Sequence, residues 1–396
     1  MRIERWAGLL LAAAPFMAGC GDFWQPPSGG GGGGGCTTNC TTLSSGNFYI
    51  LNTGATPQIV GESIVSGTLT PISGSPWTVS STPYSMAMAP NGNFLTVSTT
   101  SGVFSYPIAS GKLGTAVAAS GDLVAGAIGI DYSFSWLVEA AQNTGGVSLA
   151  AIPINSTTGA NNGAELTQFY PVTGAALQSN RLVISRDNKY IFVSLGLGGT
   201  LVVPFNAGAA SGTSPLGTTG TLIPTVNAAG SALSVAVDPN STPHLFYVGE
   251  TLANSAKNAG ALRAFLYSSL GGTLAELSSS PISSGGLAPN YILPNGTGSI
   301  VYVANGAGAS SAGNVSSFTV TGSGTAYTLA SGSSATAGTQ PAGLAEDGQS
   351  NFMLVVSSLG SPYLEGYTFD ATTAGKLDSQ ITANTGSAPV AIVATQ

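Results

Sequence analysis

The chain has 396 residues, long enough for two average domains or for one large all-β domain. Hydrophobic residues make up 43% of the chain and charged residues only 6%, and 56 residues are glycine. This hydrophobic content excludes a disordered chain, and the many short apolar runs separated by Gly, Asn, Ser and Pro indicate all-β structure with tight turns. The formal net charge is -7. Because Lys and Arg form no cluster, nucleic acid and strongly phosphorylated substrates are not expected as partners.

The first 19 residues are predicted to be a lipoprotein signal peptide. Arg2 and Arg5 give a positively charged start, and the apolar stretch that follows is too short to span a bilayer as a stable helix. The stretch ends in Met17-Ala-Gly-Cys20, which resembles a lipobox, so Cys20 is the predicted lipidation site. The alternative is an ordinary secretory signal followed by a chance cysteine. The prediction is a lipid-anchored protein of the cell envelope, on the periplasmic or the cell-surface side.

Residues 20–46 are predicted to be a flexible tether. Seven consecutive glycines, Gly29 to Gly35, cannot pack into a core and behave as a flexible coil. Cys36 and Cys40 follow, and two cysteines in an exported protein most simply form a local disulfide. A metal site is the alternative, but two thiolates without a nearby histidine are an incomplete ligand set. No other metal site and no cofactor are predicted.

Residues 47–396 consist of internal repeats. One unit, Pro83 to Val97, contains an apolar strand, a Pro-Asn-Gly turn and a second apolar strand. The same pattern recurs in units that begin at Ala125, Arg181, Ser234, Asn290 and Ala342. Each unit then adds a third strand, and most add a Gly-x-Leu sequence that opens a fourth. Four antiparallel strands in a unit of this length are typical of a β-propeller blade.

The two ends of this domain are predicted to share one blade. The first strand, Asn47 to Leu51, matches the second strand of a unit, whereas the last segment, Ala388 to Val393, matches a first strand. Joined, they complete a blade and remove the free sheet edges that favour aggregation. The prediction is therefore an all-β, seven-bladed β-propeller with four antiparallel strands per blade, closed when the C-terminal strand joins the first blade.

The repeats also resemble those of a known family. Gly67-Thr-Leu-Thr-Pro-Ile-Ser-Gly-Ser-Pro-Trp77 and Val301-Tyr-Val-Ala-Asn305 look like the repeats of seven-bladed lactonase-type propellers. That family includes 6-phosphogluconolactonases, cycloisomerase-like enzymes and YVTN-repeat surface proteins. The resemblance covers all the blades and implies the fold. It also implies a site of His, Arg and acidic groups at the channel mouth, of which the matching histidine is not evident here.

In a four-stranded blade, the loops between second and third strands lie on the same face as the connections from one blade to the next. The candidate site residues lie on that face, at the channel mouth. Arg181 begins a first strand, and Glu139 and Glu250 end second strands. These three are the predicted catalytic residues, with Arg181 polarising a lactone carbonyl and a Glu acting as base. The alternative is that Arg181 only pairs with a Glu across the ring and rigidifies it. Three asparagines at comparable positions are predicted binding residues: Asn52, Asn290 and Asn305.

Other ionisable residues favour structural roles. His244 is the only histidine and lies in a turn between first and second strands, on the opposite face, where it is poorly placed to act as a base. No Ser–His or Cys–His nucleophile pair can be built without a further histidine. Asp187, Asp238 and Asp347 occupy the same class of turn, where a carboxylate accepts N–H bonds from the turn backbone.

Depleted charge and the missing histidine favour binding over catalysis. The leading interpretation is a tethered, monomeric propeller that binds a neutral small molecule, a glycan, a peptide or a protein partner at the channel mouth. The alternative is a metal-independent hydrolase of a non-phosphorylated lactone that uses Arg181, Glu139 and Glu250. A third interpretation is an assembly factor for other envelope proteins, which an exposed apolar patch on one face would favour.

Overall fold

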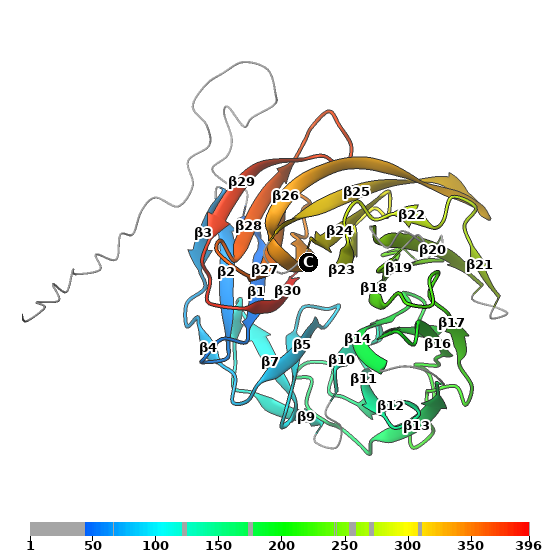
Figure 1. Ribbon diagram of the computed structural model, residues 1–396. Helices are drawn as coiled ribbons and strands as arrows, with labels where there is room; N and C mark the ends of the chain where they lie inside the picture. The colour runs from blue at the N-terminus through cyan, green and yellow to red at the C-terminus, as the bar shows by residue number, and fades with distance from the viewer. Residues whose placement is uncertain are drawn as a thin grey trace, which may run out of the picture.

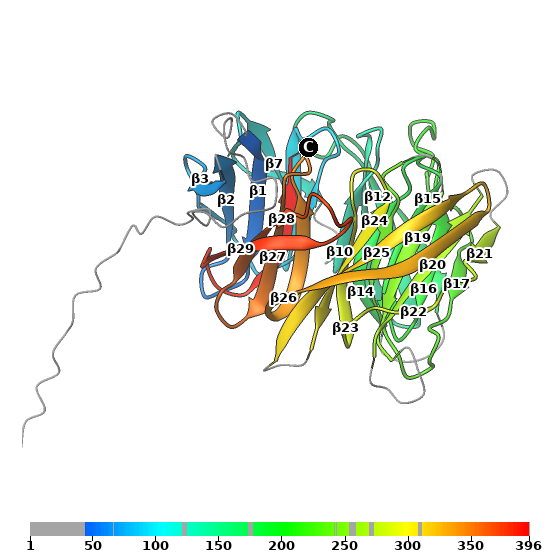
Figure 2. The same ribbon diagram turned by 90° about the horizontal axis from the view of Figure 1, so that it is seen from above.

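The β-sheets are arranged in a ring around a common centre (Figure 1). The computed structural model describes residues 44–65, 67–120, 125–172, 177–240, 242, 244–252, 259–268, 273–307 and 311–395. Within these ranges the regular structure is β-strand, and neighbouring strands pair in the antiparallel sense. Figure 2 shows the strands crossing the thickness of the ring. The described part of the chain contains no helix with the length and apolar character needed to span a bilayer.

Each sheet has four strand positions, counted outward from the channel. The first position is held by β5 (Pro83–Met88), β10 (Ala127–Ile130), β14 (Leu177–Ile184), β18 (Ala232–Val237), β23 (Ala288–Pro294), the second half of β26 (Ala326–Glu346) and β30 (Pro389–Ala394). The second position is held by β6 (Phe94–Thr99), β11 (Trp136–Asn143), β15 (Tyr190–Gly196), β19 (Leu245–Glu250), β24 (Ile300–Gly306), β27 (Phe352–Leu359) and β1 (Ser44–Asn52).

The outer positions contain shorter and less regular strands. The third is held by β7 (Gly102–Ala109), β12 (Gly146–Pro153), β16 (Thr200–Pro204), β20 (Ala261–Tyr267), β25 (Ala312–Ser323), β28 (Leu364–Phe369) and β2 (Gln58–Val65). The fourth is held by β8 (Lys112–Leu113) with β9 (Val117–Ser120), β13 (Leu166–Pro171), β17 (Thr221–Ile223), β21 (Leu274–Glu276) with β22 (Ile282–Ser283), the first half of β26, β29 (Leu377–Ala383), and β3 (Thr68–Pro71) with β4 (Trp77–Thr78).

The boundaries between sheets are clear from the strand pairing. β26 pairs with β25 along its first half and with β27 along its second half, so one continuous strand serves two adjacent sheets. β15 and β18 are joined only by a single bridge between Gly196 and Ala232. Divided at these two places, the pairings form groups with four strand positions each, and these groups follow one another around the ring. The molecule is therefore a β-propeller.

The C-terminal strand closes the ring, as the two matching ends of the sequence predict. β30 pairs with β1, which places Ile392 opposite Ile50 and Ala394 opposite Phe48. β1 also pairs with β2 and begins at Ser44, before the predicted domain start at Asn47. The first and last described strands therefore belong to the same sheet.

The core lies between the sheets and not within a single layer. The buried apolar side chains form separate clusters, each of which joins two neighbouring sheets around the ring. The second strands are buried on both faces, which explains why several contain continuous apolar runs, such as residues 245–248 of β19. Each sheet thus depends on both of its neighbours for burial, and the cluster at the closure contains Phe48 and Ile392.

The closure can be tested at Ile392, whose side chain is 1% exposed. Ile392→Ala is expected to lower the free energy of unfolding by about 2–5 kcal/mol, because it leaves a cavity between the first and last sheets. Leu222→Ala, at an exposed position of the outer strand β17, should change it by less than about 0.5 kcal/mol. Urea denaturation followed by circular dichroism measures both values. Equal effects of the two substitutions would contradict a closure that depends on β30.

Candidate functional site

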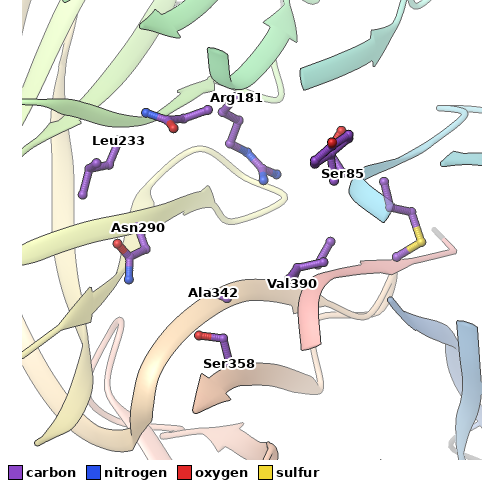
Figure 3. A pocket seen from close by; sticks show the side chains of 11 residues that line it. Ser85, Arg181, Leu233, Asn290, Ala342, Ser358 and Val390 are labelled. Carbon is purple, nitrogen blue, oxygen red and sulfur yellow. The ribbon is translucent and has the colours of Figure 1, made fainter. Parts of the chain in front are cut away.

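The first strands converge on a cavity of about 320 Å³ at the centre of the ring (Figure 3). Its polar wall consists of Tyr84, Ser85, Asn180, Arg181, Asn290 and Ser358, and its apolar wall of Met86, Leu233, Ala342, Val390 and Ala391. Most of these residues lie in the first half or the middle of first strands. The cavity therefore lies toward the face that carries the sheet-to-sheet connections and the loops between second and third strands, which we term the crossover face.

Arg181 is the cation of this cavity. Its side chain extends from β14 into the space between Ser85 and Asn290 (Figure 3). The guanidinium carbon lies 3.7 Å from the ring centroid of Tyr291, a buried residue of β23. Stacking occupies the flat face of a guanidinium and leaves the N–H donors at its edge available. Those donors form no hydrogen bond and no ion pair with the residues that the structure describes.

Two asparagines add hydrogen-bond acceptors to the wall. Asn180 donates from Nδ2 to the carbonyl of Ala232 at 3.0 Å, and Asn290 donates from Nδ2 to the carbonyl of Pro341 at 2.9 Å. These bonds fix both amides. Each amide oxygen has no hydrogen-bond partner within the described ranges, so it can accept a bond from a hydroxyl group of a ligand.

Glu139 and Glu250 do not line the cavity, in contrast to the predicted arrangement. Their side chains are 0% and 1% exposed and lie between sheets, because both belong to second strands that neighbouring sheets cover. Among the cavity-lining residues that the structure describes there is no Asp, Glu or His. Arg181 also makes no ion pair with a described residue, so the alternative of a rigidifying Arg–Glu pair across the ring does not describe it either.

Glu250 belongs to an ion cluster whose three side chains come from neighbouring strands of one sheet. Its Oε1 lies 2.9 Å from Nη1 of Arg263, and its Oε2 accepts the backbone N–H of Val226 at 2.8 Å. Arg263 also makes a two-bond contact with Glu276, at 3.0 and 2.7 Å. Burial raises the pKa of Glu250, and the Arg263 charge opposes that shift. Glu250 therefore supports the connection that precedes β18.

Glu139 faces a neighbouring sheet instead of the channel. Ser120, the last residue of β9, donates its hydroxyl to Oε2 of Glu139 at 3.3 Å. The same hydroxyl lies 3.4 Å from Oε2 of Glu165. These contacts place Glu139 beside Ser120, where the chain leaves β9 for the next sheet. Glu139 therefore resembles Glu250 in contacting a residue at a sheet-to-sheet connection.

The three predicted asparagines separate into two groups. Asn290 lines the cavity, whereas Asn52 and Asn305 are each 1% exposed. Asn52 donates from Nδ2 to the carbonyl of Thr385 at 2.9 Å, and Asn305 donates to the carbonyl of Ser284 at 2.8 Å. Both acceptors lie in connections between sheets. A buried backbone carbonyl needs a hydrogen-bond donor. Asn52 and Asn305 supply one, so the structure assigns them a structural role in place of the predicted binding role.

The turn residues on the opposite face have the contacts that the sequence predicts. Asp347 accepts the backbone N–H groups of Asn351 and Phe352 at 2.7 Å each, Asp238 accepts that of Asn240 at 2.8 Å, and Asp187 accepts that of Lys189 at 3.3 Å. His244 precedes β19, and its Nδ1 lies 3.8 Å from Oδ2 of Asp187. None of these residues lines the cavity.

Some predicted sites fall outside the described ranges, and some cavity residues were not predicted. Cys20, Cys36 and Cys40 belong to the first 43 residues, which the structure does not describe. Within the described ranges no group of His, Cys, Asp and Glu side chains could hold a metal ion. Sequence reasoning missed Asn180 and Tyr291. Asn180 could have been found, because it directly precedes Arg181 in a first strand. Tyr291 could not, because its contact with Arg181 joins two sheets that are not adjacent.

The fold is that of lactonase-like β-propellers of known structure. A Bacteroides fragilis protein provisionally assigned as a 6-phosphogluconolactonase matches with a TM-score of 0.67 and 18% identity, covering 90% of this chain and 99% of its own. The Pseudomonas aeruginosa periplasmic gluconolactonase matches with a TM-score of 0.63 and 16% identity, covering 89% and 99%. No protein-family model and no curated protein matches the sequence. At these identities the likeness establishes the fold, as the sequence resemblance predicts, and the chemistry must be argued from the site.

The ion cluster allows the structural role of Glu250 to be tested. Arg263→Met is expected to lower the free energy of unfolding by about 3–5 kcal/mol at pH 7, because the Glu250 carboxylate stays buried without its cation. Glu250→Gln should cost clearly less, since Arg263 keeps its two bonds to Glu276. Urea denaturation of both variants measures the difference.

The pH dependence of the Arg263→Met variant gives a second measurement. A carboxyl whose pKa is raised by folding binds more protons in the folded state, so stability falls as pH rises through that range and returns as pH falls. The loss in Arg263→Met should therefore shrink between pH 7 and pH 5. A loss that is larger in Glu250→Gln, or that grows toward pH 5, would contradict this account of the cluster.

Proposed function

We propose that the central cavity binds a small, hydroxyl-rich molecule that carries one carboxylate, such as a sugar acid. The observation that carries this proposal is Arg181, a cation in the cavity wall with its donors unused and with no acidic side chain beside it among the described residues. One guanidinium matches one carboxylate through two parallel N–H···O bonds. The proposal replaces the neutral ligand expected from the sequence with a singly charged one.

The rest of the wall suits the hydroxylated part of such a ligand. The amide oxygens of Asn180 and Asn290 can accept bonds from ligand hydroxyl groups. The Ser358 oxygen can accept as well, since its own proton is donated to the Gln340 carbonyl. The Ser85 hydroxyl shares one bond with Ser98 and has room for a second. The apolar wall can pack against the C–H groups of a sugar carbon chain. A mostly apolar cavity with a few convergent polar groups is the usual form of a small-molecule site.

We place this binding function outside the cytoplasm. The supporting observations are the predicted signal peptide over residues 1–19, the lipobox at Cys20 and the Gly-rich segment that follows. A structural relative named a periplasmic gluconolactonase is consistent with that location. Lipid attachment at Cys20 and a monomeric state remain part of the proposal.

Arg181→Ala tests the binding function directly. Loss of a charge-assisted two-bond contact is expected to weaken binding of D-gluconate or D-glucuronate by about 30-fold or more. The matched control is Arg186→Ala, which removes an exposed arginine stacked at 4.6 Å on Tyr132 on the opposite face and should leave affinity unchanged. Isothermal titration calorimetry at low ionic strength measures both, with D-glucose as the neutral comparison. Equal binding of D-glucose and D-gluconate by the unmodified protein would overturn the proposal.

Hydrolysis of a non-phosphorylated sugar lactone is the second candidate. It is favoured by the likeness to the periplasmic gluconolactonase and to proteins provisionally assigned as lactonases. In this scheme the Arg181 donors bind the lactone carbonyl and stabilise the negative charge that develops on its oxygen as water attacks. The described cavity wall supplies no carboxylate to take the proton from that water, so Arg181 is the one residue on which the candidate depends.

Hydrolysis of D-glucono-1,5-lactone, followed by titration of the acid released, separates the two candidates. If the protein is a lactonase, Arg181→Ala should lower kcat/KM by about 100- to 1000-fold, as for the loss of an oxyanion donor. Glu139→Gln should leave kcat/KM unchanged, because Glu139 lies outside the cavity. Turnover no faster than the spontaneous reaction would exclude this activity for gluconolactone and leave the binding function.

A further inference from the structure

The described loops on the two faces of the ring differ in charge. On the crossover face, none of the described loops and sheet-to-sheet connections contains a charged residue. On the opposite face, the turns between first and second strands contain charged residues in several sheets, including Asp131, Arg186, Lys189, Asp238 and Asp347. Among the described residues of this face, the charge closest to a ligand in the cavity is therefore that of Arg181.

The crossover face also carries most of the exposed apolar side chains. Eight large apolar residues are exposed in the described part of the chain. Five of them lie in or directly beside the loops and connections of this face: Tyr84, Leu197, Val226, Leu287 and Leu359. Single exposed apolar residues are ordinary, but their concentration on a face whose described loops carry no charge, around a cavity, indicates a binding surface.

Three of these residues line the cavity or lie close in sequence to a residue that lines it. Tyr84 lines the cavity and is 45% exposed, so it belongs both to the cavity wall and to the exposed apolar surface. Leu359, 44% exposed, directly follows the cavity residue Ser358, and Leu287, 43% exposed, shortly precedes Asn290. We call Tyr84, Leu287 and Leu359 the apolar rim.

Hydrogen bonds connect the Leu287 and Leu359 parts of the rim through Gln340. Nδ2 of Asn290 lies 3.5 Å from Oε1 of Gln340, and the hydroxyl of Ser358 donates to the backbone carbonyl of Gln340 at 3.2 Å. The two cavity residues nearest in sequence to Leu287 and Leu359 therefore share Gln340 as a hydrogen-bond partner.

We propose that the ligand is amphiphilic: a sugar acid whose carboxylate binds Arg181 and whose apolar substituent lies across the rim. This inference rests on the proposed function and names its ligand class more closely. The cavity, about 320 Å³, is at the small end of the range for ligand sites, so a molecule larger than one sugar unit must extend onto the crossover face. There it meets exposed apolar side chains, and the described loops of that face add no charge.

A series of alkyl β-D-glucuronides tests the inference, with calorimetric titration of the methyl, propyl and hexyl compounds. Because transfer of each methylene from water to an apolar surface strengthens binding, the hexyl compound is expected to bind about tenfold or more tightly than the methyl compound. The double variant Leu287→Ser/Leu359→Ser should lose this gain from chain length. The matched control is Leu222→Ser, at a 41% exposed leucine of the outer strand β17, which should retain it.

The outcomes separate this inference from the proposed function. If methyl glucuronide binds through Arg181 but affinity does not rise with chain length, the inference is wrong and the proposed function stands. If hexyl glucuronide binds equally well to Arg181→Ala, its alkyl chain adsorbs independently of the cavity and the inference is also wrong. If no glucuronide and no gluconate binds, the proposed function fails as well.

Discussion

Each sheet of this ring has two apolar faces, and only neighbouring sheets can bury them. An open row of the same sheets would leave two apolar faces and two unpaired strand edges in water, both of which favour association with other chains. The pairing of β30 with β1 removes these faces and edges together. Because the central cavity is the space left where the first strands meet, its shape depends on the same closure.

Closure brings together side chains that the sequence keeps far apart. Arg181 belongs to β14 and Tyr291 to β23, with β18 of the intervening sheet between them, yet the guanidinium stacks on the phenol ring at 3.7 Å. A charge that is partly removed from water is costly unless it is compensated, and an aromatic face compensates it in part while leaving the edge donors unused. The contact therefore holds Arg181 in a fixed orientation without consuming its ability to bind an anion.

Sequence reasoning reached the fold because repetition and strand alternation are local signals. Short stretches of sequence were enough to predict three features correctly: the apolar strands, the turn residues Asp238 and Asp347, and the matching ends near Asn47 and Val393. The site was reached only in part. Arg181 and Asn290 lie in first strands, which face the channel, whereas residues at the ends of second strands, such as Glu250 and Asn305, turn between the sheets to bind connecting backbone. Whether a side chain faces the channel or lies between sheets depends on which neighbouring sheet covers it. A local sequence pattern contains no information on that packing.

Arg181, which has no ion-pair partner among the described residues, also helps to decide between binding and hydrolysis. A lactone is neutral, and the acid that its hydrolysis releases is anionic, so Arg181 attracts the product more strongly than the substrate. An efficient enzyme must bind the transition state more tightly than either substrate or product. A carboxylate near Arg181 would weaken binding of the anionic product and would also supply a general base. The described cavity wall contains no such carboxylate. The same feature that would slow a lactonase by product retention is an advantage for a protein whose task is to hold a sugar acid.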